Sequence, residues 1–412
     1  MSDNIPFEIQ IEIMKKLPIK SLIQFRSVSK SWRSLIDSSD FISHYRTHMQ
    51  HLLVSYTVDD ISDTKYLSIV DDDTFPNQRV CLHVHSFVNM LNCGHIIGNS
   101  HGLLCSYRGY FKDHDNKTRG MAVIWNPMIR KSVAVVVPNV ARGGDYHTIL
   151  GFGVCHDTID PKIVKITCIE KHCIGNNKLS SLVRESISSI PWQVEVFTLS
   201  TGVWRRPYNN LPRKSIRFAS YAKVVDGVVY WLADDVEPGY SICNMIMSFD
   251  MTTEEFKEIK LPDSLAQPDS LAQPDKRLLI SKLRDALIVL DWDGIRFYDI
   301  WMMDSVSQSF TKLFMVNEDI SLVAYIHGFR KNGEAIFEVS DNGHSSELVV
   351  YEPNSKRFDY IDGIDGSYLT FYVSSYIETL LLLDQPDLTV YNENQTFKYR
   401  DDLFQELNLF SG

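Results

Sequence analysis

Residues 5–41 read IPFEIQIEIMKKLPIKSLIQFRSVSKSWRSLIDSSDF. Within this stretch Ile5, Ile9, Ile13 and Leu17 recur at every fourth position, which places them on one face of a helix. Leu17-Pro18 ends that helix, and two further runs with helical spacing follow. A helical module of about 40 residues is too small to enclose this much apolar surface. We therefore expect three short helices whose apolar surface meets a partner, most simply another protein.

The order of these residues resembles the F-box. The F-box pattern opens with Leu-Pro, continues to a second Leu-Pro with Lys-Ser-Leu soon after, and closes on Val-Cys-Lys-x-Trp, Leu-Ile and Phe. This chain has at those positions Ile5-Pro6, Leu17-Pro18, Lys20-Ser21-Leu22, Val28-Ser29-Lys30-Ser31-Trp32, Leu35-Ile36 and Phe41. Ile5 and Ser29 depart from the pattern, but each keeps a side chain of similar size.

The resemblance implies a partner for the helices, the Skp-type adaptor of a Skp/cullin/F-box ubiquitin ligase. The residues at the adaptor-contact positions of the family are Ile5, Pro6, Ile13, Leu17, Pro18, Leu22, Val28, Trp32 and Leu35. Some of these side chains must also fill the core of the small helical module itself. The sequence alone does not separate the two roles.

Charge argues against a nucleic-acid partner. The chain has 412 residues, 44% of them apolar, and a net charge of −11. Beyond residue 50 it holds 34 basic and 47 acidic residues. Nucleic-acid binding needs basic patches, so this balance indicates solubility or, less simply, a basic partner.

Cysteine usage indicates a reducing compartment. The seven cysteines form an odd set with no Cys-x-x-Cys pair. No run of residues is apolar enough to span a bilayer, and the polar, acidic N-terminus is unlike a signal peptide. We expect the protein in the cytoplasm, the nucleus or both, with no membrane partner.

The rest of the chain repeats one unit. Phe197, Phe249 and Tyr351 each end a strand-like run and are followed seven residues later by another aromatic residue. Looser copies are centred on Trp125 and Trp301. The steps from Phe197 through Phe249 and Trp301 to Tyr351 are 52, 52 and 50 residues. Kelch-type propeller blades have a period of about 50 residues, so the spacing predicts an all-β, propeller-like domain with these four aromatic residues at equivalent, buried positions.

Glycine turns support the blades. Gly102, Gly227 and Gly333 each precede a strand-like run, and Asp-Gly and Asn-Gly favour hairpin turns with positive φ. The kelch double glycine is absent. Six segments together resemble the F-box-associated domain of the large plant F-box family, which includes the S-locus F-box proteins: IIGNSHGLLCSY, VIWNPMIRKSV, GFGVCHDTIDPKIVKI, VDGVVYWLA, SFDMTTEEFKEIKLP and YDIWMMDS. That resemblance implies a domain that recognises a substrate.

The predicted organisation is therefore multidomain α+β. We expect a three-helix F-box at 1–45, a connecting segment at 46–94, the propeller-like F-box-associated domain at 95–390 and a tail at 391–412. The duplicated PDSLAQ, at 262–267 and 268–273, is expected to form an exposed loop because of its prolines. The number of blades and the closure of the ring stay open.

The sequence offers only weak candidates for a catalytic or metal-binding site. Ser100 lies in a Gly-x-Ser-x-Gly match, but a strand rather than a helix is expected after Gly102, so a hairpin turn is favoured over a nucleophile elbow. Metal sites are disfavoured because the candidate groups lack a fourth ligand or the spacing of a calcium loop. These groups are Cys81 with His83 and His85, Cys168 with His172 and Cys173, and Asp71 to Asp73, which we expect in a solvated loop. We expect no cofactor.

The sequence favours a non-catalytic adapter. Its F-box would bind the Skp-type adaptor and through it a cullin, while the β domain holds an unidentified target protein. An F-box scaffold outside ubiquitination and a β-propeller enzyme are the alternatives. We expect the target to contact the loops of the β domain, where sequence can vary without harm to the core.

Overall fold

The structure is a computed structural model of the whole chain. It describes residues 5–45, 49–58, 60–84, 88, 95–112, 118–138, 140, 146–169, 194–213, 215–235, 243–266, 277–293, 297–317, 323–340, 344–386, 389–392 and 395–398.

Four short helices form the N-terminal module, one more than the sequence predicts. They are α1 (Phe7–Met14), α2 (Ile19–Phe25), α3 (Lys30–Ile36) and α4 (Ser39–His44). Pro6 and Pro18 precede α1 and α2, where a missing N–H costs no helical hydrogen bond. The hydroxyls of Ser29 and Ser38 accept backbone N–H groups and so cap α3 and α4.

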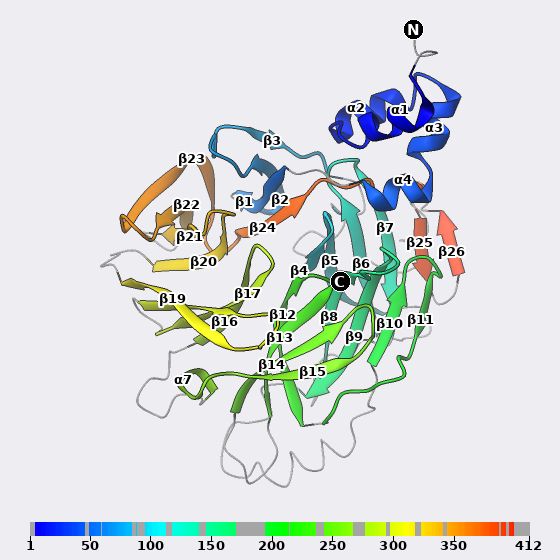
Figure 1. The fold of residues 1–412 in the computed structure, drawn as a ribbon. Coiled ribbons are helices and arrows are strands. Elements are labelled where there is room, and N and C mark those ends of the chain that lie inside the picture. Colours follow the sequence, from blue (N-terminus) through cyan, green and yellow to red (C-terminus); the bar gives the residue numbers. More distant parts are fainter. Residues whose placement is uncertain are drawn as a thin grey trace.

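The described strands form six blades around a central axis (Figure 1). From the inner to the outer strand, the first blade is β24 (Tyr372–Ile377), β1 (Gln50–Val58), β2 (Asp60–Val70) and β3 (Arg79–Cys81). The second is β4 (His95–Ser100), β5 (Leu103–Lys112), β6 (Thr118–Asn126) and β7 (Lys131–Val137). The third is β8 (Tyr146–Val154), β9 (Pro161–Ile169), β10 (Val194–Thr198) and β11 (Val203–Arg205).

The remaining blades have the same order of strands. The fourth is β12 (Ile216–Val225), β13 (Val228–Asp235), β14 (Cys243–Asp250) and β15 (Phe256–Lys260). The fifth is β16 (Arg277–Leu283), β17 (Ala286–Trp292), β18 (Phe297–Met303) and β19 (Phe310–Asn317). The sixth is β20 (Val323–Phe329), β21 (Ala335–Ser340), β22 (Ser345–Glu352) and β23 (Arg357–Ser367). A hairpin of β25 (Thr389–Asn392) and β26 (Gln395–Lys398) extends the second blade, with β25 parallel to β7.

The first blade closes the ring. Its inner strand β24 comes from the C-terminal part of the chain and pairs antiparallel with β1 from the N-terminal part. Residues 50–81, which the sequence analysis assigns to a connecting segment, therefore supply three strands of a blade. The repeat is hidden there because this blade takes its inner strand from about 320 residues away, so no local glycine turn introduces it.

The aromatic repeat is confirmed at three of its four positions. Phe197, Phe249 and Tyr351 lie on the third strand of their blades, fully buried, and each pairs across the sheet with the aromatic residue seven positions later. In the fifth blade the prediction is off by two residues. There Met303 pairs with Phe310 and holds the position that the aromatic residue has in the other three blades, while Trp301 faces Lys312 and is only half-buried.

The glycine turns lie where the inner strand of a blade turns into its second strand. His101 and Gly102 both have positive φ, as do Asp226 and Gly227, which is the requirement of a type I′ turn. Ser100 thus ends a strand that is followed by a hairpin and another strand. Its hydroxyl accepts the N–H of Val154 in the next blade, so its role is structural.

The first PDSLAQ copy differs from the expected exposed loop. Asp263–Ala266 form the one-turn helix α7, and Leu265 is buried against the fourth and fifth blades. The helix starts directly after Pro262, whose fixed φ suits a first turn. The second copy lies outside the described residues.

Gly102 offers a test of the ring closure. A Cβ on Gly102 would clash with the carbonyl oxygen of Ile377, at the end of the closing strand, and the φ of Gly102 is +77°. We expect Gly102→Ala to lower the free energy of unfolding by ~2–4 kcal/mol, through clash and strain together. Gly333→Ala is the matched control, because its φ is +100° but no atom lies within 4 Å of the added Cβ. Chemical denaturation should show a loss of only about 1 kcal/mol there. Equal losses in the two variants would contradict close packing of the closing strand.

Candidate adaptor and target interfaces

Five apolar side chains of the helical module are exposed. Ile5, Phe7, Ile9 and Ile13 on and before α1, together with Val28 after α2, have between 44% and 63% of their surface exposed. Ile5, Ile9 and Ile13 follow one side of α1, and we call the exposed apolar surface of all five residues the apolar face. Apolar side chains that stay in water forgo about 25 cal/mol per Å² of burial, so this many on one small module are typical of a protein interface.

The predicted adaptor-contact residues divide into three groups. Ile5, Pro6, Ile13, Pro18 and Val28 are exposed, whereas Leu17, Trp32 and Leu35 are half-buried. Leu22 is wholly buried in the core below the helices, so its side chain packs inside this chain, and its predicted contact with an adaptor stays a prediction. The reason is its position on the inner side of α2, next to the propeller.

Trp32 has a supporting role within the module. Its indole ring packs 5.1 Å from the ring of Phe25, and its Nε1–H donates to Oε1 of Gln10 at 3.2 Å. These contacts join α3 to α1 and α2. A change at Trp32 therefore disturbs the shape of the module as well as any interface.

Phe7 and Ile9 belong to the apolar face but are missing from the predicted set. Ile9 carries the clearest signal in the sequence, because it continues the spacing of Ile5 and Ile13. Phe7 follows the proline that starts α1, and nothing in the spacing marks it. Its exposure depends on how α1 is oriented on the module.

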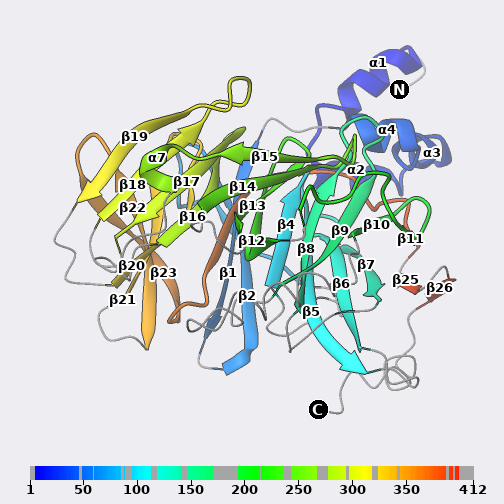
Figure 2. The same cartoon turned by 90° about the horizontal axis from the view of Figure 1, so that it is seen from below.

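The opposite side of the module packs on the propeller (Figure 2). One hydrophobic cluster unites residues of all four helices with strands of the second and third blades and with Leu380 to Leu383, just after the closing strand. The Tyr45 hydroxyl donates to the Leu17 carbonyl at 2.7 Å, which ties the end of the module to the start of α2. The F-box and the propeller thus share a core.

Polar groups fix the segment after the closing strand. Asn126 is wholly buried, and its Nδ2 donates to the carbonyls of Thr379 and Leu381 at 2.8 and 2.9 Å. The Glu378 carboxylate accepts the N–H of Ile19 at the start of α2, while burial raises the pKa of that carboxyl. His51 Nε2 lies 3.7 Å from Glu378 Oε1, and burial lowers the pKa of His51.

A cleft opens at the centre of the ring, on the face where the inner hairpins turn. Its volume is about 710 Å³. The walls are the hairpin turns of the second, fourth, fifth and sixth blades and the ends of β24 and β1, because consecutive strands alternate in direction and bring these turns to one face. We call this space the central cleft.

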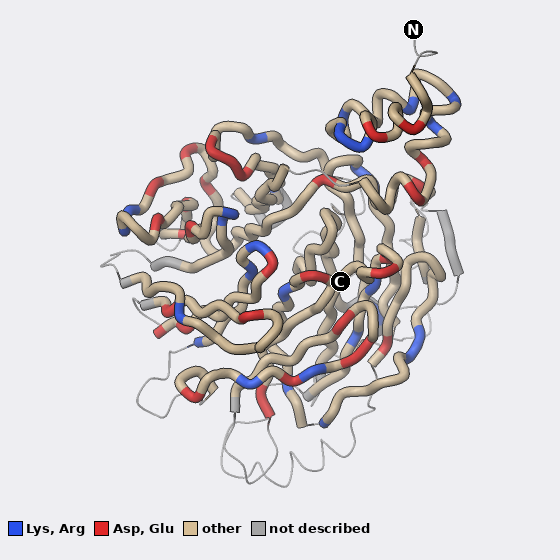
Figure 3. Tube along the Cα trace, in the orientation of Figure 1, with Lys and Arg blue, Asp and Glu red and all other residues tan. Residues whose placement is uncertain are grey.

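Basic side chains outnumber acidic ones in and below the central cleft. Lys282, Arg284 and Lys331 line it, with Asp226 and Asp285 as the acidic residues. Figure 3 shows basic and acidic positions together at the tip of the β16–β17 hairpin, which leans toward the centre of the ring. The Arg284 Nε–H is already used, because it donates to the carbonyl of Lys331 at 2.6 Å.

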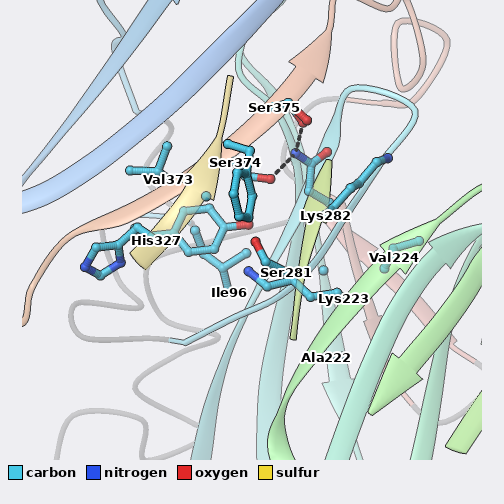
Figure 4. Close-up of a pocket in the computed structure, with 15 residues that line it drawn as sticks. Ile96, Ala222, Lys223, Val224, Ser281, Lys282, His327, Val373, Ser374 and Ser375 are labelled. Atoms are coloured by element: carbon cyan, nitrogen blue, oxygen red, sulfur yellow. Dashed lines mark hydrogen bonds between the residues drawn. The ribbon is translucent and has the colours of Figure 1, made fainter. Parts of the chain in front are cut away.

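A smaller cavity of about 30 Å³ continues below the central cleft, in the channel between the inner strands. The two spaces share Asn99, Val224, Lys282 and Ser375. Lys223, Ser281, His327 and Ser374 lie around this cavity (Figure 4). Asn99 Nδ2 donates to the Ser374 hydroxyl and to the Ser375 carbonyl, so these walls are rigidly paired.

The two channel lysines are in unusual surroundings. Neither Lys223 nor Lys282 forms an ion pair with any residue in the described part of the chain, and the Lys223 ammonium lies 5.8 Å from the centroid of the Tyr372 ring. Burial lowers the pKa of Lys223 to about 8 and also lowers the pKa of Lys282, although Asp285 and Asp226 counteract it there. By contrast, Nε2 of His327 in the same channel lies 2.6 Å from Oε2 of the buried Glu338, which pairs the ring with a carboxylate.

The metal candidates of the sequence form no grouped site among the residues that the structure describes. In the described ranges no three His, Cys, Asp or Glu residues are grouped so that they could hold a metal ion. Cys81 and His83 are exposed, whereas His85, His172 and Cys173 lie outside the described residues. Asp71 is expected from the sequence in a solvated loop, but it is buried. Its carboxylate accepts hydrogen bonds from Arg330 Nε and the Lys331 N–H, which compensate for the lost solvent.

Among the described helices, none is both long and apolar enough to cross a membrane.

Comparison with known families agrees with this architecture. Residues 51–368 match the F-box associated β-propeller domain, and residues 2–44 match the F-box domain. The chain belongs to the F-box proteins that carry this propeller domain.

Its relatives include plant F-box proteins. The F-box protein CPR1 of Arabidopsis thaliana is 24% identical over 381 residues, covering 86% of this chain and 83% of that protein. An F-box/kelch-repeat protein of Arabidopsis thaliana is 22% identical over 333 residues, covering 76% and 79%. Among solved structures, TolB from Acinetobacter baumannii aligns with a TM-score of 0.41 at 10% identity, covering 80% of this chain and 66% of that chain. A likeness of that size carries no information on function.

Lys223 gives a prediction on stability and pH. The folded protein releases the Lys223 proton near pH 8, whereas the unfolded chain keeps it to about 10.5. Burial of the charged Lys223 therefore lowers the free energy of unfolding most below pH 8. Between pH 8 and 10.5 the free energy of unfolding rises, because the unfolded state binds more protons there. We expect Lys223→Met to raise the free energy of unfolding at pH 7 by about 1–2 kcal/mol.

Urea denaturation at several pH values would measure this effect. The difference between Lys223→Met and the wild-type protein should narrow from pH 8 to pH 10. Lys260→Met is the control, because Lys260 is exposed on β15, and it should leave stability nearly unchanged. A Lys223→Met protein less stable than wild type at pH 7 would show that the ammonium is well accommodated.

Proposed function

We propose that this protein is the substrate-recognition adapter of a Skp/cullin/F-box ubiquitin ligase. Its F-box binds a Skp-type adaptor and through it a cullin, and its propeller holds a target protein. Ubiquitin transfer is done by other subunits. The adapter acts by geometry, because a target lysine kept near a charged conjugating enzyme has a high effective concentration.

The observation that carries the proposal is that the F-box exposes its apolar face while its other side packs on the propeller. The helices are anchored through a shared core with the propeller, so the apolar face needs no part in holding the protein together. It is available to a partner, and the family to which the chain belongs provides the Skp-type adaptor as that partner. Among the described residues, Cys81, Cys105 and Cys155 are free thiols, which fits a reducing compartment, the cytosol or nucleus.

The alternatives lead to different observations. An F-box scaffold outside ubiquitination would bind the Skp-type adaptor without a cullin in the same complex. A propeller enzyme would need acid and base groups that converge on a substrate in the channel. The described channel holds one carboxylate–imidazole pair, His327 with Glu338, and that carboxylate is occupied by the Ser346 hydroxyl and the Leu369 N–H.

Two substitutions test adaptor binding. Ile13→Asp and Val28→Asp place a carboxylate in the apolar face, and both positions are exposed, so the fold should tolerate them. We expect each to weaken binding of a purified Skp-type adaptor at least 100-fold, because a charge buried without a partner costs several kcal/mol. Interferometry with the full-length chain would measure the affinity.

Val306→Asp is the matched control for these variants. Val306 is 92% exposed in the turn between β18 and β19, on the propeller. Its variant should bind the adaptor as tightly as wild type. Undiminished binding by both Ile13→Asp and Val28→Asp would overturn the assignment of the apolar face.

Target binding can be separated from adaptor binding in the full chain. Removing residues 1–45 would uncover the shared core, so a variant with Ile13→Asp and Val28→Asp together is the better reagent. With proteasome activity blocked, affinity capture with this variant should lose the Skp-type adaptor and cullin but keep the target. A target lost together with the adaptor would contradict recognition by the propeller alone.

A further inference from the structure

The central cleft is positive although the protein is acidic. Beyond residue 50 the chain has 34 basic and 47 acidic residues, yet the cleft and the cavity below it hold four basic residues against two acidic ones. The basic residues are Lys223, Lys282, Arg284 and Lys331. Concave walls of low dielectric strengthen the field of such charges relative to an open surface.

Lys223 and Lys282 differ from other buried cations of this chain, because neither forms an ion pair with a described residue. Elsewhere in this propeller, buried cations have close acidic partners. Lys162 Nζ lies 2.8 Å from Glu254 Oε1, and Arg217 makes a two-pronged contact with Asp234. Lys223 and Lys282 have no such partner in the described part of the chain, and burial opposes their charge. Desolvated cations of this kind are stabilised by an anion that enters from outside.

The volumes of the central cleft and of the cavity below it limit which kind of molecule can carry that anion. The lower cavity of about 30 Å³ is the size of one water molecule, so it admits only the tip of a group. The cleft above it, of about 710 Å³, accommodates several residues of a peptide. A peptide that lies across the cleft and directs one anionic side chain downward fits both spaces.

We propose that the central cleft binds an acidic segment of the target protein, with a carboxylate or phosphate group of that segment held by Lys282 and Lys331 above Lys223. This proposal rests on the proposed function, because it names the chemistry of the target. It differs from the expectation of a basic target patch, which follows from the charge of the whole domain and not from the cleft.

Three labelled decapeptides would test it on the full-length chain by fluorescence anisotropy. One has a central pair of glutamates, one a central pair of phosphoserines and one a central pair of glutamines, in the same Gly-Ser background. We expect at least one acidic peptide to bind at least tenfold more tightly than the glutamine peptide, with an affinity that falls as salt rises. Preference for glutamate or for phosphoserine, and competition by inorganic phosphate, would identify the anion.

Substitutions locate the binding. Lys282→Gln and Lys223→Met should each weaken the preferred acidic peptide about tenfold, whereas Lys260→Gln, on the exposed outer strand β15, should not. All three variants should still bind the Skp-type adaptor, which also shows that they fold. The proposal is overturned if the acidic peptides bind no better than the glutamine peptide, or if binding survives both substitutions. Either result, with adaptor binding intact, leaves the adapter function in place.

Discussion

The whole molecule depends on the closing strand and the few residues after it. β24 pairs with β1 and so joins the two ends of the ring, and the chain then runs directly beneath the F-box. Asn126 holds this segment by two hydrogen bonds to its carbonyls, and Glu378 receives the first N–H of α2. Because Asn126 is wholly buried, losing it would leave several backbone groups unpaired at once. Closure of the propeller and seating of the F-box are therefore one structural event.

This arrangement sets the distance between the two proposed interfaces. Ile377 lines the central cleft and is followed by Glu378, which contacts α2, while Gln50 lines the cleft at the start of β1. The path from cleft to F-box thus crosses a shared core and no long linker. A rigid path gives an adapter its effect, because the effective concentration of a tethered lysine falls when the connection can sample many positions. The hydrophobic cluster that includes Met14 and Phe152 supplies that rigidity.

Much of this fold could be predicted from the sequence, for reasons that are local. Ordered F-box residues and the seven-residue spacing of aromatic pairs reflect neighbouring positions on one helix or one hairpin. The differences have long-range and local causes. The first blade is not predicted because its inner strand lies at the other end of the chain. Trp301 is misplaced because Met303 holds the position that an aromatic residue has in the third, fourth and sixth blades. The burial of Leu22 is not predictable either, because helical spacing does not say which side of α2 meets the propeller.

The central cleft could not be predicted for a related reason. Lys223 and Lys282 stand 59 residues apart on inner strands of different blades, and each is an unremarkable lysine in its own segment. Packing of the fourth blade against the fifth places both in one channel, where their charges are partly desolvated and neither forms an ion pair with a described residue. A propeller core built for stability alone would carry apolar or paired residues there, as Lys162 with Glu254 shows for this same chain. The apolar face of the F-box has the same character, since Ile9 and Ile13 stay in water although burial would favour the fold. Both features lower the free energy of unfolding of the isolated protein, and binding of a partner with matching chemistry offsets that loss.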